Sequence, residues 1–353
     1  MAYTTIDDGS AHFQAQTYTG TAGVNNIVNT GNSDLQPDWV WLKSRAITQP
    51  HTIRDSTRGT NKFLYISTAD EGTNTYLTSF NSDGFSLNAT DNEVNGNSDT
   101  YVSWQWKAGG GSGNRTTFTE SGNNPGGGRQ VNTTAGYSII DYTGTGGNGT
   151  IAHGLGATPK LVFVKNRDGG TNDSWFTHWT GLLGDNKVLY WNSTDGAQTN
   201  ASAFNSTAPT STNITVGTNT ATNADGNTYI MYAFTDIQGY SKFGAYEGNG
   251  NANGPFVYTG FKPAFIQIKS VDSAQVWSIR DNIRNPDNPA KLAIYANETG
   301  VESDHVNNSI DLLSNGFKLT NPYSENQNGE TFVYMAFAQH PFVSSKGVPV
   351  TAN

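Results

Sequence analysis

The stretch "DNEVNGNSD" at residues 91–99 gathers oxygen-bearing side chains within nine positions. Closely spaced carboxylate and carboxamide oxygens are the ligands that Ca²⁺ takes in proteins. The candidate ligands are Asp91, Glu93, Asn95 and Asp99. The stretch lacks the bidentate glutamate of an EF-hand register, and related parts of the chain do not keep its acids. We therefore expect no obligatory cofactor, and Ca²⁺ is the metal for which the sequence offers a candidate site.

An Arg–Asp–Arg pattern occurs twice at one spacing, in "IRDSTR" at 53–58 and "IRDNIR" at 279–284. Asp55 and Asp281 are therefore candidates for acids or ligand contacts. The corresponding stretch "FTHWTGLLG" at 176–184 has neither the arginines nor the aspartate. A buried or interfacial Arg–carboxylate pair explains this pattern more simply than a shared active site. We expect Asp55 and Asp281 to be structural.

No other constellation in the sequence points to catalysis. A glycosidase needs two carboxylates about 5–10 Å apart, and the acids of this chain fall in turns rather than inside the recognisable strands. The six histidines have no metal-ligand spacing, and no serine elbow or cysteine nucleophile is present. We expect a protein that is not an enzyme, with a polysaccharide depolymerase as an alternative.

The pair Trp39 and Trp41, in "PDWVWLKSR", lies on one face of a predicted strand and could stack sugars or fill a core. Self-comparison favours the core. "PDWVWLK" (37–43) recurs as "PKLVFVK" (159–165) and "PAFIQIK" (263–269), where ordinary side chains stand at the tryptophan positions. We expect both tryptophans to pack against an adjoining strand, unit or subunit, and Trp104 and Trp106 of a later strand to be structural as well.

The whole chain is a threefold repeat of one pattern of elements. Each copy opens on a Tyr-x-Gly motif and continues through the "PDWVWLK"-type strand and an "SDGFSL"-type turn. Each copy closes on "TYVSWQWK", "TYIMYAFT" or "TFVYMAFA", strands in which alternate residues are apolar. Period two with one consistently apolar face is typical of antiparallel sheets that cover a core. The pattern predicts an all-β fold of three tandem, related antiparallel β-sandwich modules of jelly-roll, lectin-like type.

The repeats divide the chain at predicted boundaries. We expect an N-terminal segment at 1–17 that docks on a partner subunit, modules at 18–108, 131–238 and 239–344, a Gly/Asn-rich linker at 109–130 and a C-terminal tail at 345–353. The linker stretch has too little apolar content to pack and is typical of flexible connections.

Composition and charge exclude several classes of function. Aromatic residues reach 12%, enough for a packed core, and the net charge is −9 without any run of Lys or Arg. Nucleic-acid binding requires clustered basic residues, and no apolar stretch is long enough to span a bilayer. We expect no nucleic-acid partner, no membrane insertion and, from the N-terminal sequence, no signal peptide. The chain has no cysteine and therefore no disulfide.

The run "SDGFSL…TYVSWQWKAGG", with "GYSKFGAYEGNG", "GPFVYTGFKPAFIQIK" and "FVYMAFAQHPF", resembles a repeated module of structural proteins of marine tailed bacteriophages, especially cyanophages. The resemblance extends from about residue 18 to 342. It implies lectin-like (concanavalin A-like) sandwiches in a tail-fibre-like virion protein. The motif residues are core and turn positions, so no catalytic or binding residue carries over.

These observations predict a virion surface protein, synthesised in the host cytoplasm, that acts as an appendage or adhesin contacting host surface glycans. Its partners would be other virion proteins and further copies of itself, with a homotrimer as the most plausible oligomer. The alternative is a capsid decoration or head-fibre protein without a specific receptor. Weak contacts to glycans would be strengthened by multivalency.

Overall fold

The computed structural model describes residues 2–67, 71–169, 174–304 and 308–350. Met1 and residues 351–353, the outer ends of the predicted N-terminal segment and tail, lie outside the described residues. The described chain is almost entirely β-structure in antiparallel sheets, as the alternating sequence predicts. Its described helical elements are one four-residue α-helix, α1 (Thr220–Asn223), and the short 3-10 turns η1 (Gly9–Ala11), η2 (Ser112–Asn114) and η4 (Ser324–Asn326). No described helix has the length and apolar character needed to cross a membrane.

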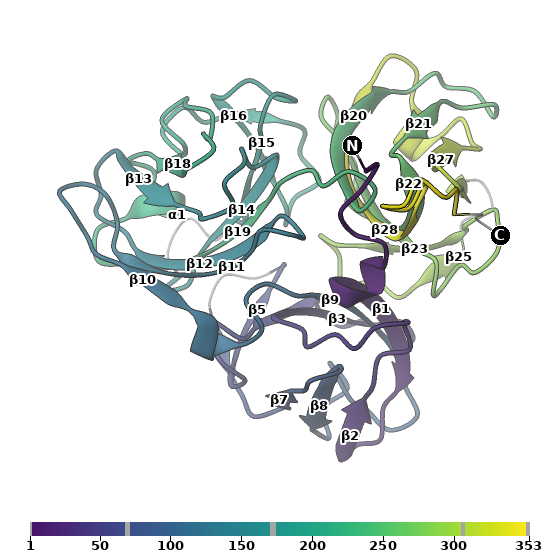
Figure 1. Ribbon diagram of the computed structural model, residues 1–353, viewed down its shortest axis with the longest axis horizontal. Helices are drawn as coiled ribbons and strands as arrows, with labels where there is room; N and C mark the ends of the chain where they lie inside the picture. Colours follow the sequence, from purple (N-terminus) through teal and green to yellow (C-terminus); the bar gives the residue numbers. More distant parts are fainter. Residues whose placement is uncertain (1, 68–70, 170–173, 305–307, 351–353) are drawn as a thin grey trace.

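Figure 1 shows three lobes arranged around a common centre. The first lobe comprises β1–β9, the second β10–β19 and the third β20–β28, and each has a large sheet backed by a small one. In the first lobe the large sheet has the order β1 (Phe13–Thr19), β9 (Thr100–Trp106), β3 (Trp39–Ser44), β4 (Thr52–Asp55), β5 (Lys62–Tyr65), β6 (Gly72–Thr73), and the small sheet β2 (Val24–Ile27), β8 (Phe85–Asn88), β7 (Leu77–Phe80).

The second and third lobes repeat this strand order. The second large sheet is β10 (Thr116–Phe118), β11 (Gly127–Asn132), β12 (Tyr137–Thr143), β19 (Thr228–Phe234), β14 (Leu161–Asn166), β15 (Phe176–Trp179), β16 (Lys187–Tyr190), β17 (Gln198–Thr199), and the small sheet β13 (Gly149–Ala152), β18 (Asn213–Val216). The third large sheet is β20 (Ser241–Glu247), β28 (Thr331–Pro341), β22 (Phe261–Ser270), β23 (Ser278–Asp281), β24 (Leu292–Tyr295), β25 (Ser303–Asp304), and the small sheet β21 (Phe256–Tyr258), β27 (Gly316–Leu319), β26 (Ile310–Leu313). The second lobe differs by the additional outer strands β10 and β11 and by a small sheet of two described strands instead of three.

Both faces of each large sheet are buried, for different reasons. Trp41 lies opposite Trp104 in the ladder between β3 and β9, so the tryptophans of both strands share one face. The opposite face carries Val40 and Leu42, which pack with the small sheet in a separate cluster. The sequence pattern predicts that the Val40 face of β3 and the Trp104 face of β9 both cover the core of their lobe. The register shows that these two apolar faces point to opposite sides of one sheet.

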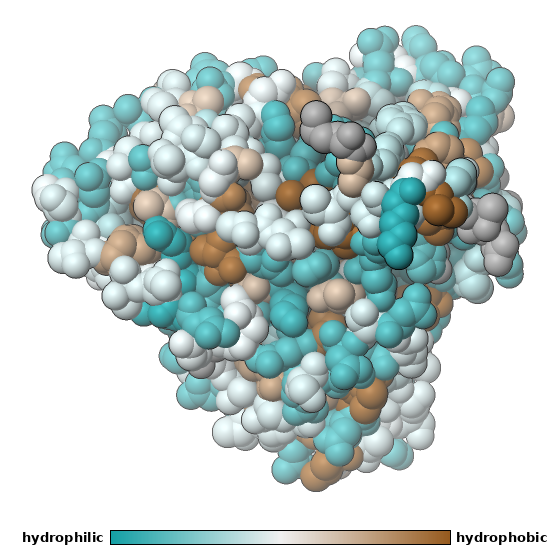
Figure 2. All heavy atoms as spheres, viewed as in Figure 1, coloured by the Kyte–Doolittle hydropathy of each residue, from teal (hydrophilic) through white to brown (hydrophobic). Residues whose placement is uncertain are grey.

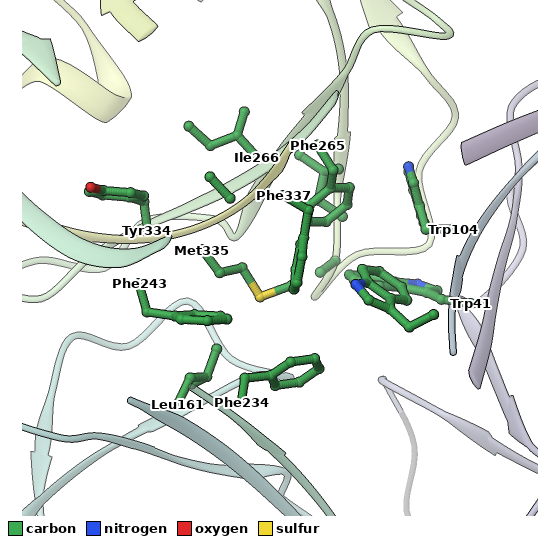
Figure 3. Packing of buried hydrophobic residues seen from close by; sticks show 14 of the residues in the cluster. Trp41, Trp104, Leu161, Phe234, Phe243, Phe265, Ile266, Tyr334, Met335 and Phe337 are labelled. Atoms are coloured by element: carbon green, nitrogen blue, oxygen red, sulfur yellow. The ribbon is translucent and has the colours of Figure 1, made fainter. Parts of the chain in front are cut away.

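The tryptophan face of the first lobe meets the corresponding faces of the other two lobes in one shared core. Trp39 stacks at 4.7 Å on Tyr232 of the second lobe, and Trp41 lies 6.2 Å from Phe265 of the third. Figure 3 shows Phe234 of the second lobe close to Phe337 of the third, with a centroid separation of 5.8 Å. All eight tryptophans of the chain are less than 2% exposed. The largest apolar side chains therefore hold the lobes to one another, where removing their surface from water stabilises most.

Two predicted segments differ from the structure. The stretch 109–130, expected to be a flexible linker, contains β10 and the first residues of β11, which extend the second large sheet. Backbone hydrogen bonds in a ladder order this glycine-rich stretch, and its Phe118 packs against the core of the second lobe. The N-terminal segment 1–17, expected to dock on a partner subunit, contains most of β1 and packs within the chain. The hydroxyl of Tyr3 donates to the carbonyl of Gly260 at 2.8 Å, and Ile6 is buried in the shared core.

Candidate functional site

Asp55 lies at the interface between the first and second lobes, in a buried ionic network. Its Oδ2 accepts from Arg58 Nε at 2.6 Å and from the hydroxyl of Tyr232 in the second lobe at 2.7 Å. Arg58 also contacts Glu71, which accepts two further bonds from Arg167 of the second lobe at 2.7 and 3.0 Å. Burial raises the pKa of Glu71, but its bond from Arg167 and the charge of Arg58 outweigh burial and lower that pKa to about 2.

The interface between the first and third lobes repeats this network. Asp281 Oδ2 accepts from Arg284 Nε at 2.6 Å and from the indole N–H of Trp104 at 2.9 Å. Glu302 accepts from Arg284 at 3.1 Å and from Arg45 of the first lobe at 2.7 Å. The pKa of Glu302 is raised by burial and lowered more strongly by its arginine partners, with a net decrease. Both aspartates are fully buried and paired with arginine.

At the interface between the second and third lobes, apolar residues occupy the same positions. Trp179 and Leu182 stand where Asp55 and Arg58 stand in the first lobe, at the end of the equivalent strand β15. Ala197 and Val271 take the positions of Glu71 and Arg167, and Met335 takes that of Tyr232. All five belong to the shared core or pack against it: Trp179, Leu182, Ala197, Val271 and Met335.

The backbone geometry is nevertheless the same at all three interfaces. The amides of Glu71, Glu302 and Ala197 donate to the carbonyls of Arg167, Arg45 and Val271 at 3.2, 3.0 and 2.7 Å.

A second set of bonds also runs around the ring. Trp175 of the second lobe donates its indole N–H to the carbonyl of Tyr65 in the first, and Trp277 of the third donates to that of Tyr190 in the second. A His51 ring nitrogen of the first lobe lies 3.0 Å from the carbonyl of Tyr295 in the third. The three lobes therefore follow one cyclic arrangement.

Buried lysines also reach from one lobe to the next. Lys43 Nζ donates to the carbonyl of Thr299 in the third lobe at 3.2 Å, and Lys269 Nζ donates to that of Thr194 in the second at 2.8 Å. Both side chains are almost fully buried. Burial lowers the pKa of each ammonium group from its usual 10.5 to about 8. The sequence shows these residues as the final lysine of each "PDWVWLK"-type strand, but it does not show that they cross an interface.

The candidate calcium ligands form hydrogen bonds with different groups of this chain. Glu93 accepts from the hydroxyls of Thr52 and Tyr65, both at 2.6 Å. Asp91 accepts from the Glu93 amide at 2.7 Å and from the hydroxyl of Tyr76 at 3.1 Å. Asp99 lies near Gly96. Within the residues that the structure describes, no group of three or more histidine, aspartate or glutamate side chains has the geometry to hold a metal ion.

The fourth candidate ligand, Asn95, instead fixes a loop. Its amide donates to the carbonyls of Gly23 and Ala89, and its carbonyl accepts from the Thr21 amide. Asn223 and Asn326 make the same three kinds of bond in the second and third lobes. All three asparagines are fully buried.

The Tyr-x-Gly tyrosines bind beside these asparagines. The hydroxyls of Tyr18, Tyr142 and Tyr246 donate to the carbonyl of the residue before the buried asparagine, at 2.8, 2.5 and 2.7 Å. The repeated tyrosine was visible in the sequence, whereas its asparagine partner was hidden among many other asparagines.

A pocket of about 220 Å³ opens where the first and third lobes meet at the edge of β1. Phe13 and Ala15 of β1 line it from the first lobe, and Ala264, Asn282, Ile283 and His340 line it from the third. The described lining residues include no aspartate, glutamate, lysine or arginine. Such a lining suits an uncharged group that forms hydrogen bonds.

Comparison with curated proteins finds no match to this chain. A family model does match, over residues 8–341, and this range includes all three lobes and their interfaces. The family therefore corresponds to the three-lobed unit as a whole rather than to one lobe. The chain belongs to the family described as a domain of unknown function, DUF7483.

Proposed function

We propose that this chain is a non-enzymatic surface protein of a bacteriophage virion, built from three related β-sandwich modules of lectin-like type. It acts as a tail-fibre-like adhesin that contacts host surface glycans. The virion assignment is supported by the resemblance of its sequence motifs to phage structural proteins. The observation that carries the adhesive role is the burial of every tryptophan in the shared core, which leaves loops and small sheets as the contact surface.

The outward loops support weak, repeated contacts. The buried asparagine of each lobe fixes one loop rich in Gly, Asn and Thr, at residues 20–25, 144–149 and 248–254. A fixed polar loop loses little conformational entropy when it binds. Three such loops in one rigid ring supply multivalency within a single chain.

The third lobe adds exposed aromatic surface. Phe256 and Tyr258 project from β21 with 46% and 55% of their surface exposed, while Val257 between them is buried. Flat aromatic side chains at the surface are the groups on which sugar rings stack. Figure 2 shows hydrophilic residues over all three lobes on the face in view, with apolar residues in small scattered groups. This surface is consistent with local contacts to polar ligands.

The first experiment labels intact phage particles with gold-conjugated antibody against this protein. Label on the tail or its fibres supports the adhesin. Label spread over the head favours capsid decoration, and absence of label on particles that contain the protein by mass spectrometry contradicts surface exposure.

A glycan array with purified protein then tests the ligand class. Binding that weakens at least tenfold in Tyr258→Ala, and is unchanged in the matched Tyr323→Ala, places the contact on β21. Tyr323 is 59% exposed but lies outside that strand. Release of reducing ends from host glycans would instead identify a depolymerase and overturn the proposal. Light scattering tests the proposed homo-oligomer.

A further inference from the structure

The three lobes have three equivalent strand edges, those of β1, β12 and β20, and the groups that pair with the backbone differ from one edge to the next. In the second lobe β11 pairs along β12 and places Gln130 opposite Ile139. In the first and third lobes β1 and β20 are the outermost described strands of their large sheets. An unpaired sheet edge presents N–H and C=O groups that another strand can bind.

A side chain occupies one outward N–H on the edge of β20. The amide of Phe243 donates to Asp236 Oδ1 at 2.8 Å, so this N–H points away from the sheet neighbour β28. Phe243 lies opposite Met335, and Ala15 of β1 lies opposite the equivalent residue Trp104. The Ala15 amide therefore points outward as well. Among the described residues, no side chain or loop donates to or accepts from the backbone of Ala15.

The pocket beside β1 corresponds to a place that is filled in the second lobe. The carboxamide of Gln130 is fully buried, 3.0 Å from Ser56 Oγ and 2.7 Å from Thr57 Oγ1. These two residues follow Asp55. Asn282 and Ile283 follow the equivalent Asp281 and line the open pocket.

We propose that β1 accepts an antiparallel strand from a partner chain, and that a glutamine or asparagine of that strand enters this pocket. β11 on β12 shows the geometry inside the same molecule. A strand added to β1 in the register of β11 places one side chain opposite Ala15, which lines the pocket. Because the lining has no Asp, Glu, Lys or Arg and carries Asn282 and His340 as hydrogen-bonding side chains, a carboxamide fits better than a charged group.

The probe is a fluorescein-labelled peptide with the sequence of residues 124–132, NPGGGRQVN, which includes all of strand β11. The native β11 already covers β12, and Asp236 takes the N–H of Phe243 on β20, which leaves β1 as the edge whose equivalent N–H, that of Ala15, is open. Binding to the full chain is followed by fluorescence polarisation. We expect saturable binding that weakens at least tenfold in Ala15→Pro, since proline removes the outward N–H without touching the β9 ladder.

Ala245→Pro is the matched control. The N–H of Ala245 points outward from β20, as that of Ala15 does from β1, but Ala245 lies away from the pocket. It should bind the peptide like the wild type. If Ala15→Pro does not fold, as judged by circular dichroism, Ala15→Trp fills the pocket from the same position and should also abolish binding. A peptide with alanine in place of its glutamine should bind at least threefold more weakly.

Three results overturn the proposal. They are absence of binding at the solubility limit of the peptide, equal binding to both proline variants, and displacement of the peptide by free N-acetylglucosamine, which would assign the pocket to a glycan. If the wild type self-associates and Ala15→Pro is monomeric, the occupant is a second copy of this chain rather than a different partner.

Discussion

The two interfaces of the first lobe are ionic, whereas the interface between the second and third lobes is apolar, although the backbones meet in the same way at all three. Asp55 and Asp281 with their arginines stand where the third interface has Trp179 and Leu182. The repeated backbone bonds between lobes are present at each. The shared core and these backbone bonds therefore fix the arrangement of the lobes, while the side-chain chemistry of an interface is exchangeable.

The physical reason lies in the balance of charge burial. Removing two charges from water costs about as much as their attraction returns, so a complete buried network adds little net stability compared with apolar residues of similar volume. An incomplete network leaves a charge without a partner and is strongly unfavourable. The ionic and apolar interfaces should therefore respond very differently to a single substitution.

The largest expected effect comes from removing one member of a network. Asp55→Ala leaves Arg58 and the Tyr232 hydroxyl buried without their carboxylate. We expect the free energy of unfolding to fall by about 3–5 kcal/mol, measured by urea denaturation. Arg115→Ala, which breaks the partly exposed pair with Asp141, is the control and should cost at most about 1 kcal/mol. Equal losses in the two variants would contradict the contrast.

Replacing the whole network should have a smaller effect in the opposite direction. The variant Asp55→Trp, Arg58→Leu, Glu71→Ala, Arg167→Val, Tyr232→Met copies the second–third interface into the first–second one. Because the variant leaves no buried charge of the network unpaired, and Lys62, which also contacts Glu71, is partly exposed to solvent, we expect a folded protein between neutral and about 4 kcal/mol more stable than the wild type. A loss as large as that of Asp55→Ala would show that the ionic set is specifically required there.

Acid should destabilise the ionic interfaces more than the apolar one. The pKa of Glu71 in the folded state is about 2, below its unfolded value of about 4.5, so its stabilising contribution is present above pH 4.5 and is lost as the pH falls toward 2. We expect a loss on the order of 2 kcal/mol from this residue, below the full value of the shift because solvent reaches part of the site. The five-residue apolar variant should show a smaller loss in the same window, and parallel pH profiles would contradict the assignment.

The smallest effect concerns the buried lysines, which cross ionic and apolar interfaces alike. The folded-state pKa of Lys43 and Lys269 is about 8, below the usual 10.5, so the unfolded chain binds more protons between these values. The contribution of these lysines to stability should therefore rise from pH 8 to pH 10, by on the order of 1 kcal/mol per lysine. Buried tyrosines such as Tyr142 and Tyr240, whose pKa values are raised by burial, lower the stability as the pH approaches 10, so the lysine contribution is measured as the wild-type stability minus that of a Lys43→Met, Lys269→Met double variant. Thermal unfolding of both proteins gives this difference, and a difference that falls across the window would refute the depressed pKa values.

Period-two alternation and the repeated motifs were sufficient to predict an all-β chain, and the replacement of Trp39 and Trp41 in other copies predicted that they pack. The paired spacing of Arg and Asp likewise predicted an ion pair. Sequence could not show that the apolar faces of β3 and β9 lie on opposite sides of one sheet, because that depends on the ladder register of Trp41 with Trp104. It also missed β10 and β11, which pair with each other and, through β11, with β12, so that only a few apolar side chains such as Phe118 and Val131 are needed to order them.

The ring of lobes closes between parts of the chain that are far apart in sequence. Arg45 and Glu302 are separated by 257 residues. The entropy of closing so long a loop is lost before its contacts form, and high contact order slows folding. An open intermediate exposes the tryptophans of the first lobe, which another chain can cover with its own third lobe. We therefore expect refolding to be slow and its yield of monomer to decrease with protein concentration, as exchange of lobes between chains competes with closure of the ring.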